Sequence, residues 1–298
     1  MESLKNKIKY YFRSFLFIFI ALAFLFSCKT TSTGPTTTTT TIYIPPAPQV
    51  EEKDTLNGAS IELSGGNFEL SNNAWGYSCN LDSCYQAIIL YTDDSYGWEW
   101  NRDLTGDNDP NYPEVICGTK PWGTQTEAEI FPIQIKDINS FNAEMDIVYG
   151  ASGNNWNLAF EFWLTEQEPG GTNVEGSITD EVMIWLGWGT THDAITIKED
   201  SAVIDGENIY DYAQYYPPYE ERIWDYHQFR ISGEQKIPSE IDFKLFVDYI
   251  KDEYNRSDTL WVSGMELGNE YWDFTEGACT VKALTYTVNG ETATSGAD

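Results

Sequence analysis

Basic residues are scarce in this sequence, where 17 Lys and Arg stand against 47 Asp and Glu and the formal net charge is −30 at pH 7. A surface this acidic repels nucleic-acid phosphates and anionic lipids, so we expect no nucleic-acid partner. Histidine is scarcer still, with only His192 and His227, and no CxxC or HxxxH pair accompanies them. The chain therefore lacks the usual ligands of a zinc site, and we expect no metal and no cofactor.

The sequence also lacks the motifs of several large enzyme classes. It contains no GxSxG elbow, no Walker motif and no GxGxxG loop, which argues against serine hydrolases and nucleotide-dependent enzymes. The segment DNDPN (107–111) begins like a calcium-binding loop but lacks the following glycine and the late glutamate, so we interpret it as a polar turn.

An apolar run, FLFIFIALAFLF (15–26), follows four basic residues near the N-terminus. It is too short to span a bilayer comfortably and has the length of the hydrophobic region of a signal peptide. The segment LFSC (25–28) then resembles a bacterial lipobox. We therefore expect residues 1–27 to be removed and Cys28 to be acylated, with a plain signal peptide and a chance cysteine as the alternative.

Residues 28–57 are rich in Thr and Pro and have almost nothing to bury. This composition predicts a flexible tether that holds a domain of residues 58–298 away from a membrane. We expect an exported protein, lipid-anchored to a bacterial membrane and more specifically to the outer membrane. The sequence leaves open whether the domain faces the periplasm or the cell surface.

Four cysteines remain after Cys28, an even number in an oxidising compartment. Cys79 and Cys84 are close enough in sequence to close one loop, which would leave Cys117 to pair with Cys279. Three pairings are possible for four cysteines, and the sequence does not choose among them.

Short alternating or apolar segments recur from residue 58 onward, separated by clusters of Gly, Asn, Asp and Pro. This spacing predicts an all-β sandwich or barrel. The segments are 59–64, 86–92, 129–135, 143–150, 157–164, 181–188, 194–199, 223–231, 259–267 and 279–289. Residues 239–250 instead carry apolar side chains at helical spacing, with Ser239 and Asp242 in a capping-box pattern, and we expect one helix packed on the outside of a sheet.

Alternation in three of these segments places a glutamate on the face that points away from the core. Glu161 shares this face with Trp163, and Glu181 shares it with a methionine and a second tryptophan. The third, Glu266, is flanked there by glycines, which allow a ligand to approach the backbone closely. Three strands therefore predict an acidic and aromatic face where a sandwich usually shows simple polar residues.

Exposed indoles on a sheet are costly unless something covers them, and a bound ligand would do so. Sugar rings fit this face, because their apolar C–H surfaces stack on indoles while their hydroxyls bond to polar groups. Two carboxyl groups about 5–5.5 Å apart across a glycosidic oxygen would support retaining hydrolysis. The pattern alone leaves open a protein that binds glycans without cleaving them.

Five segments have the order and spacing typical of glycoside hydrolase family 12, and the sequence resembles that family over residues 58–290. They are NNAWG (72–76), YPEVICGTKPWG (112–123), FEFWL (160–164), DEVMIWLGWG (180–189) and GMELGNEYW (264–272). The resemblance implies a β-jelly-roll sandwich of two antiparallel sheets with an open concave cleft and one packed helix. It also implies a retaining endo-β-1,4-glucanase, or a xyloglucanase.

By position, the resemblance implies that Glu181 is the nucleophile and Glu266 the general acid/base. Glu161 stands where the family commonly has an Asp that hydrogen-bonds to the nucleophile, so the family's pH optimum is not carried over. The family's Pro-x-Gly loop after the nucleophile strand is missing, so subsite preference is not carried over either. Substrate-binding roles fall on Asn73, Trp75, Trp122, Met183 and Trp185, to which we add Trp163 from its place beside Glu161.

We therefore predict a retaining endo-acting glycosidase that cleaves internal β-1,4 bonds of a glucan as a monomer. Two alternatives are carried forward. The enzyme can prefer xyloglucan or mixed-linkage β-glucan, or the protein can be a surface lipoprotein that binds glycans without cleaving them.

Overall fold

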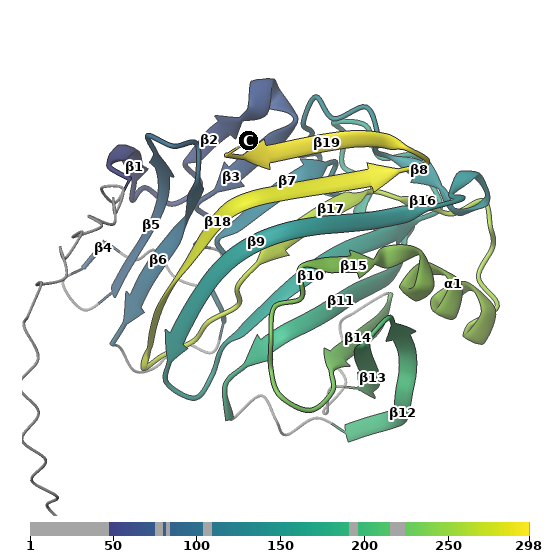
Figure 1. The fold of residues 1–298 in the computed structure, drawn as a ribbon. Helices are drawn as coiled ribbons and strands as arrows, with labels where there is room; N and C mark the ends of the chain where they lie inside the picture. Colours follow the sequence, from purple (N-terminus) through teal and green to yellow (C-terminus); the bar gives the residue numbers. More distant parts are fainter. Residues whose placement is uncertain are drawn as a thin grey trace, which may run out of the picture. The chain divides into compact units, whose positions relative to one another are not determined.

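The alternating segments form a sandwich of two β-sheets in the computed structural model (Figure 1). The structure describes residues 48–74, 80–81, 84–103, 109–190, 196–214 and 224–297. All of them belong to one unit, Ala47–Asp298. The predicted all-β sandwich is confirmed.

The smaller sheet contains eight strands within the described residues. They are β1 (Val50–Asp54), β4 (Asn80–Leu81), β5 (Cys84–Tyr91), β6 (Tyr96–Arg102), β9 (Phe141–Ser152), β15 (Glu240–Asp242), β18 (Thr275–Val288) and β19 (Glu291–Gly296). Their order is β1-β5-β6-β18-β9-β15, with β4 beside β5 and β19 beside β18.

The larger sheet contains eleven strands in the same described part of the chain. They are β2 (Ser60–Leu63), β3 (Phe68–Ser71), β7 (Glu114–Gly118), β8 (Ile133–Gln134), β10 (Asn157–Thr165), β11 (Ile178–Trp188), β12 (Thr196–Asp205), β13 (Asn208–Gln214), β14 (Asp225–Ile231), β16 (Trp261–Val262) and β17 (Gly264–Gly268). Their order is β12-β13-β14-β11-β10-β17-β7-β3-β2, and β16 pairs with both β10 and β8.

One pairing corrects the prediction of two antiparallel sheets. β11 and β14 are parallel, from Asp180 opposite Asp225 to Trp185 opposite Arg230. Parallel neighbours need a long crossover connection, which here includes the β12–β13 hairpin. The crossover brings the first residues of β14 beside the start of the EVMIWL segment.

The faces predicted to form the core lie between the two sheets. On β10 and β11 the buried core residues are Leu158, Phe160, Phe162, Leu164, Val182, Ile184 and Leu186. Tyr96, Trp98 and Trp100 belong to the same core cluster from β6 in the opposite sheet. Because successive side chains of a strand alternate between faces, the burial of this set turns the intervening glutamates to the other face of the larger sheet.

The helix is present but begins later than predicted. α1 spans Phe243–Glu253, and its N-cap is Asp242, whose side chain accepts from the backbone N–H of Lys244 at 3.0 Å. Ser239 is not the cap, because its carbonyl accepts from Met145 and the next residues form β15 at the edge of the sheet. The apolar stripe of α1, which starts with Phe243, packs into the core as expected.

Segment 129–135 also differs from its prediction as a strand. Only Ile133–Gln134 form a strand, β8, and a 3-10 helix, Ile135–Asp137, follows directly. Pro132 lacks a backbone N–H, so it breaks the hydrogen-bond ladder that a longer strand would need. Two further 3-10 helices span Ser64–Gly66 and Glu175–Ser177.

The predicted tether overlaps the folded unit at its C-terminal end. Val50–Asp54 form β1, which pairs with the end of β5, and Lys53 contacts Glu99 of β6 at 2.6 Å. The signal peptide and Cys28 lie outside the described residues. Within the part that the structure does describe, no helix is both long and apolar enough to span a membrane.

The structure tests the expected cysteine pairing only in part. Cys84 is disulfide-bonded, whereas Cys117 and Cys279 are both buried free thiols. The suggested bond between Cys117 and Cys279 is therefore absent from the structure. Both thiols belong to the apolar core cluster, in which cysteine packs as a small hydrophobic residue. Cys79 lies outside the described residues.

Candidate active site

Three glutamates share one face of the larger sheet. Glu181 lies on β11 and Glu266 on β17, with Glu161 on the strand β10 between them. Glu161 is directly opposite Glu266 on one side and Met183 on the other. Side chains of directly paired residues point to the same face. The register therefore gathers the three carboxyl groups that the sequence predicts to act together.

The three carboxyl groups are nearly inaccessible although they point away from the core. Glu161 and Glu181 are each 6% exposed, and Glu266 is 2% exposed. Burial raises the pKa of Glu161 well above its usual range, and the neighbouring charges of Glu266 and Glu181 raise it further. A carboxyl group between two others favours its protonated form, because three adjacent negative charges repel one another.

Glu266 is a buried acid with a nearby cation. Burial raises its pKa, Lys120 lowers it and Glu114 raises it, which leaves the pKa of Glu266 at about 8. Lys120 Nζ lies 2.9 Å from Glu266 Oε2. A pKa near 8 keeps Glu266 protonated at neutral pH, which is the state that a general acid needs.

Lys120 links Glu266 to a second buried carboxylate. Its Nζ donates to both oxygens of Glu114 at 2.9 and 2.8 Å. Burial lowers the pKa of Lys120, but the charges of Glu114 and Glu266 outweigh this effect and leave the pKa raised. The amide of Asn73 donates to Glu114 at 3.1 Å. Asn73, a predicted substrate ligand, is thus connected to the acid/base through two ionic side chains.

Each of the two outer glutamates accepts a hydrogen bond from an indole. Trp163 Nε1 donates to Glu266 Oε1 at 3.0 Å, and Trp224 Nε1 donates to Glu181 Oε2 at 2.7 Å. A donor to a carboxylate fixes its orientation and favours its charged form. Trp163 therefore contacts the predicted acid/base directly.

The remaining predicted aromatic residues differ in exposure. Trp122 is 39% exposed and packs edge-on against Trp163, with 4.7 Å between ring centroids. Trp185 is buried in a small cluster with Met183 and Ala159 on this face. Neighbouring side chains cover most of the Trp163 and Trp185 indoles. Among the predicted tryptophans that the structure describes, the argument from exposure therefore holds only for Trp122. Trp75 lies outside the described residues.

Sequence reasoning missed four residues of this site. Trp224, Tyr226, Lys120 and Glu114 were not predicted to take part. Tyr226 lies opposite Glu181, and its hydroxyl donates to Met183 Sδ at 3.2 Å. Alternation along residues 224–230 could have placed Trp224 and Tyr226 on one face. Only the parallel pairing of β14 with β11 shows that this face is the one that carries Glu181.

An ionic network supports the nucleophile strand from its core side. Asp180, which precedes Glu181, is 0% exposed and contacts His227 Nε2 at 2.7 Å. Arg256 Nε donates to Asp180 at 2.9 Å, and Arg256 also bonds to Asp225. The oxygens of these two aspartates and the His227 nitrogen are close enough to suggest a metal site. The Arg256 guanidinium already pairs with both aspartates, so we interpret the cluster as a structural ion-pair network.

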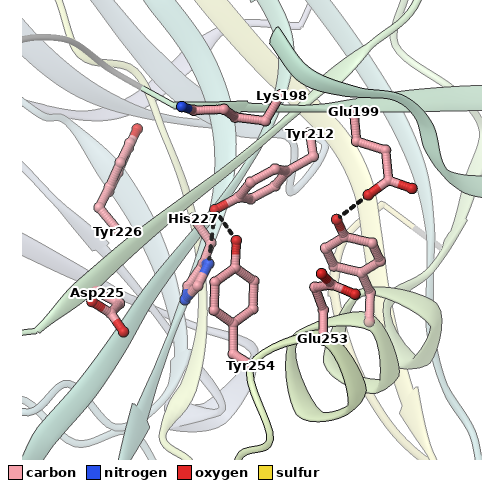
Figure 2. Close-up of a pocket in the computed structure, with 9 residues that line it drawn as sticks. Lys198, Glu199, Tyr212, Asp225, Tyr226, His227, Glu253 and Tyr254 are labelled. Atoms are coloured by element: carbon pink, nitrogen blue, oxygen red, sulfur yellow. Dashed lines mark hydrogen bonds between the residues drawn. The ribbon is translucent and has the colours of Figure 1, made fainter. Parts of the chain in front are cut away.

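A cavity of about 390 Å³ lies beside this network, between the edge of the larger sheet and α1 (Figure 2). It is lined by Lys198, Glu199, Tyr212, Asp225, Tyr226, His227, Tyr249, Glu253 and Tyr254. Figure 2 shows Tyr254 bonded to Tyr212 and Tyr212 bonded to His227, at 2.7 and 3.3 Å. None of the three glutamates lines this cavity, although it shares Tyr226 with the carboxylate site.

A β-sandwich that holds paired buried carboxyl groups among indoles fits a carbohydrate-cleaving enzyme, and the family comparison agrees. The model of Glycosyl hydrolase family 12 matches residues 66–289, and the chain belongs to this family. The protein is thus a glycoside hydrolase. A search of curated proteins finds no match.

Solved structures resemble the fold at low sequence identity. The Family 12 xyloglucanase from Bacillus licheniformis is 21% identical with a TM-score of 0.68, over 80% of this chain and 100% of that one. Endoglucanase Cel12A from Rhodothermus marinus is 20% identical with a TM-score of 0.65, over 81% and 100%. Endoglucanase 3 from Trichoderma harzianum is 19% identical with a TM-score of 0.58, over 80% and 97%.

Proposed function

We propose that this glycoside hydrolase is a retaining endo-β-1,4-glucanase. The observation that carries the proposal is the arrangement of Glu181 and Glu266 on one face, on either side of Glu161, each held by its own indole N–H. The two outer strands are separated by two strand spacings, about 10 Å between backbones. Glutamate side chains from both strands can therefore bracket one glycosidic bond.

In the first step the Glu181 carboxylate attacks the anomeric carbon while the bond to the leaving oxygen breaks. Glu266, protonated because of its raised pKa, gives its proton to that oxygen. In the second step Glu266, now a carboxylate, takes a proton from water. The water oxygen displaces Glu181 from the anomeric carbon, and two inversions retain the configuration. Glu161 limits the negative charge beside Glu181 by holding a proton.

The substrate chain would lie along the residues that surround the carboxyl groups. Trp122 offers an exposed indole for a sugar ring. Asn73, whose amide donates to Glu114, offers a polar group for sugar hydroxyls. Trp75, Met183 and Trp185 keep their predicted substrate-binding role from the family resemblance alone, because Met183 and Trp185 are each 2% exposed and Trp75 lies outside the described residues. The similar structures include a xyloglucanase as well as endoglucanases, so the proposed substrate class is a β-1,4-glucan backbone with or without side chains.

We also propose that the enzyme is exported as a lipoprotein and acts as a monomer at a bacterial membrane. The support is the N-terminal sequence, with its basic residues, short apolar run and Cys28. Metabolic labelling with a clickable fatty acid should modify the wild-type protein. The Cys28→Ala variant should remain unlabelled if Cys28 is the acylated residue.

The function is tested by incubating the purified protein with xyloglucan, barley β-glucan and carboxymethylcellulose. We expect new reducing ends, a rapid fall in viscosity and oligosaccharide products whose new anomeric centre is initially β by NMR. The polysaccharide with the highest kcat/KM identifies the preferred glucan. Binding of these chains without release of reducing sugar would contradict the proposal and favour a glycan-binding lipoprotein.

Lys120→Met is expected to shift the alkaline limb of the pH–kcat/KM profile upward by about 1–3 units. Lys120 lowers the pKa of Glu266, so its removal raises that pKa and keeps the general acid protonated to higher pH. The control is Lys282→Met, since Lys282 lies on the smaller sheet in a surface ion pair with Asp146. A limb that stays in place or moves downward, in a variant with a wild-type circular dichroism spectrum, would argue against this role.

A further inference from the structure

Two tryptophans link the predicted nucleophile to the predicted acid/base through the space above β10. Trp224 Nε1 donates to Glu181 Oε2 at 2.7 Å, and Trp163 Nε1 donates to Glu266 Oε1 at 3.0 Å. The two indole rings meet edge to face, with 5.6 Å between centroids and 81° between planes. The carboxyl groups and rings therefore form one continuous chain of contacts.

Packing fixes the directions of the two N–H bonds. The Trp163 ring makes edge-to-face contacts with both Trp224 and Trp122. An indole side chain has few rotatable bonds, so a ring fixed in this way holds its N–H in one direction. Because each indole N–H bonds to one carboxyl group and the two rings contact each other, the position of Glu181 depends on that of Glu266.

Substrate stacking is a poor explanation for Trp163. The side chain is 5% exposed, so neither ring face is available to a sugar in the way that Trp122, at 39%, is available. Trp224 is partly buried and lies directly before β14, where the parallel pairing brings it beside Glu181. Both indoles are better suited to hold catalytic groups than to bind the glucan.

We propose that Trp224 and Trp163 are positioning residues that set the orientation of Glu181 and Glu266 relative to each other. This inference rests on the proposed retaining mechanism, in which the two groups act on one glycosidic bond from fixed positions. The N–H of Trp224 favours the ionised nucleophile. The N–H of Trp163 favours the carboxylate form of Glu266, which is the form that activates water in the second step.

The test uses Trp224→Phe and Trp163→Phe, which keep an aromatic ring but remove the N–H donor. Kinetics are measured on an unactivated cello-oligosaccharide by the release of reducing ends, because its sugar leaving group needs the proton that Glu266 supplies. We expect kcat to fall about 10- to 100-fold in each variant, the effect of losing one hydrogen bond to a charged group, while KM changes less than about threefold. Trp261→Phe on β16 is the matched control and should leave both constants unchanged.

The pH profiles separate positioning from a merely structural role. Loss of the Trp224 donor raises the pKa of the nucleophile, so the acidic limb should move to higher pH by about one unit. Loss of the Trp163 donor raises the pKa of Glu266, so the alkaline limb should move to higher pH instead. A merely structural defect would lower kcat but would leave the acidic limb of Trp224→Phe and the alkaline limb of Trp163→Phe at their wild-type pH.

Two results would overturn the inference. One is a higher KM with unchanged kcat in Trp224→Phe, which would make that indole a substrate platform. The other is a lower kcat with both limbs in their wild-type positions. If Trp163→Phe fails to fold, Trp224→Phe still decides, because its side chain is partly exposed and does not belong to the core. The retaining mechanism is tested separately, by labelling Glu181 of the wild-type protein with a 2-fluoroglycoside. If the wild-type protein is neither labelled nor able to hydrolyse glucan, the proposed function itself is rejected.

Discussion

Glu181→Ala is expected to lower the rate of glucan hydrolysis by about 10⁴-fold or more, because the variant lacks the carboxylate that forms the glycosyl–enzyme ester. Sodium azide should restore turnover of a substrate with a good leaving group. The azide ion would enter the space left by the carboxylate and attack the anomeric carbon once, so the product should be an α-glycosyl azide of inverted configuration. The measurement is product analysis by NMR together with initial rates.

The control for this prediction is Glu144→Ala, which removes an exposed carboxylate from β9 on the other sheet. It should leave the hydrolysis rate unchanged. Circular dichroism should be the same for wild type and both variants, since Glu181 lies outside the apolar core cluster. Residual hydrolysis above about 10% in Glu181→Ala would reject Glu181 as the nucleophile.

Alternation predicted the strands best where one face is fully buried. On β10 and β11 every second residue packs between the sheets, so a shift of one residue would expose a whole row of phenylalanine, leucine or isoleucine. Because of that constraint, the sequence alone predicted that Glu161, Glu181 and Glu266 lie on the face of the sheet that points away from the core. The three glutamates meet because β10 pairs with both β11 and β17.

Sequence pattern could not predict contacts that depend on which strands become neighbours. The parallel pairing of β14 with β11 brings Trp224 to Glu181, although 43 residues separate them. Lys120 reaches Glu266 from a turn after β7, a position that carries no periodic signal. Both residues are specified by sheet order, and strand periodicity does not determine sheet order.

The periodicity of the sequence also could not predict strands β1 and β7 or the first residue of α1. The charged strand β1 is held mainly by backbone pairing with β5, so its side chains carry no apolar pattern. Strand β7 is buried along its whole length and shows an apolar run rather than alternation. Asp242 caps α1 in place of Ser239 because edge pairing of residues 240–242 with β9 delays the first helical turn.

Glu266→Ala is the second variant with a large expected effect, and its signature differs from that of the nucleophile variant. Hydrolysis of polysaccharide should fall by about 10²- to 10⁴-fold, because the poor leaving oxygen of a sugar needs a proton. A substrate with an acidic phenol as leaving group needs no such help. It should give a rapid burst of phenol, followed by slow turnover as the glycosyl–enzyme accumulates.

Azide should accelerate this slow second step and give a β-glycosyl azide, since attack on the ester at Glu181 is the second of two inversions. The variant should fold, because Lys120 keeps Glu114 as its partner and no buried charge is left unpaired. Opposite azide stereochemistry in the Glu181 and Glu266 variants would assign the two roles independently of any rate. An α-azide from Glu266→Ala would mean that the two roles are reversed.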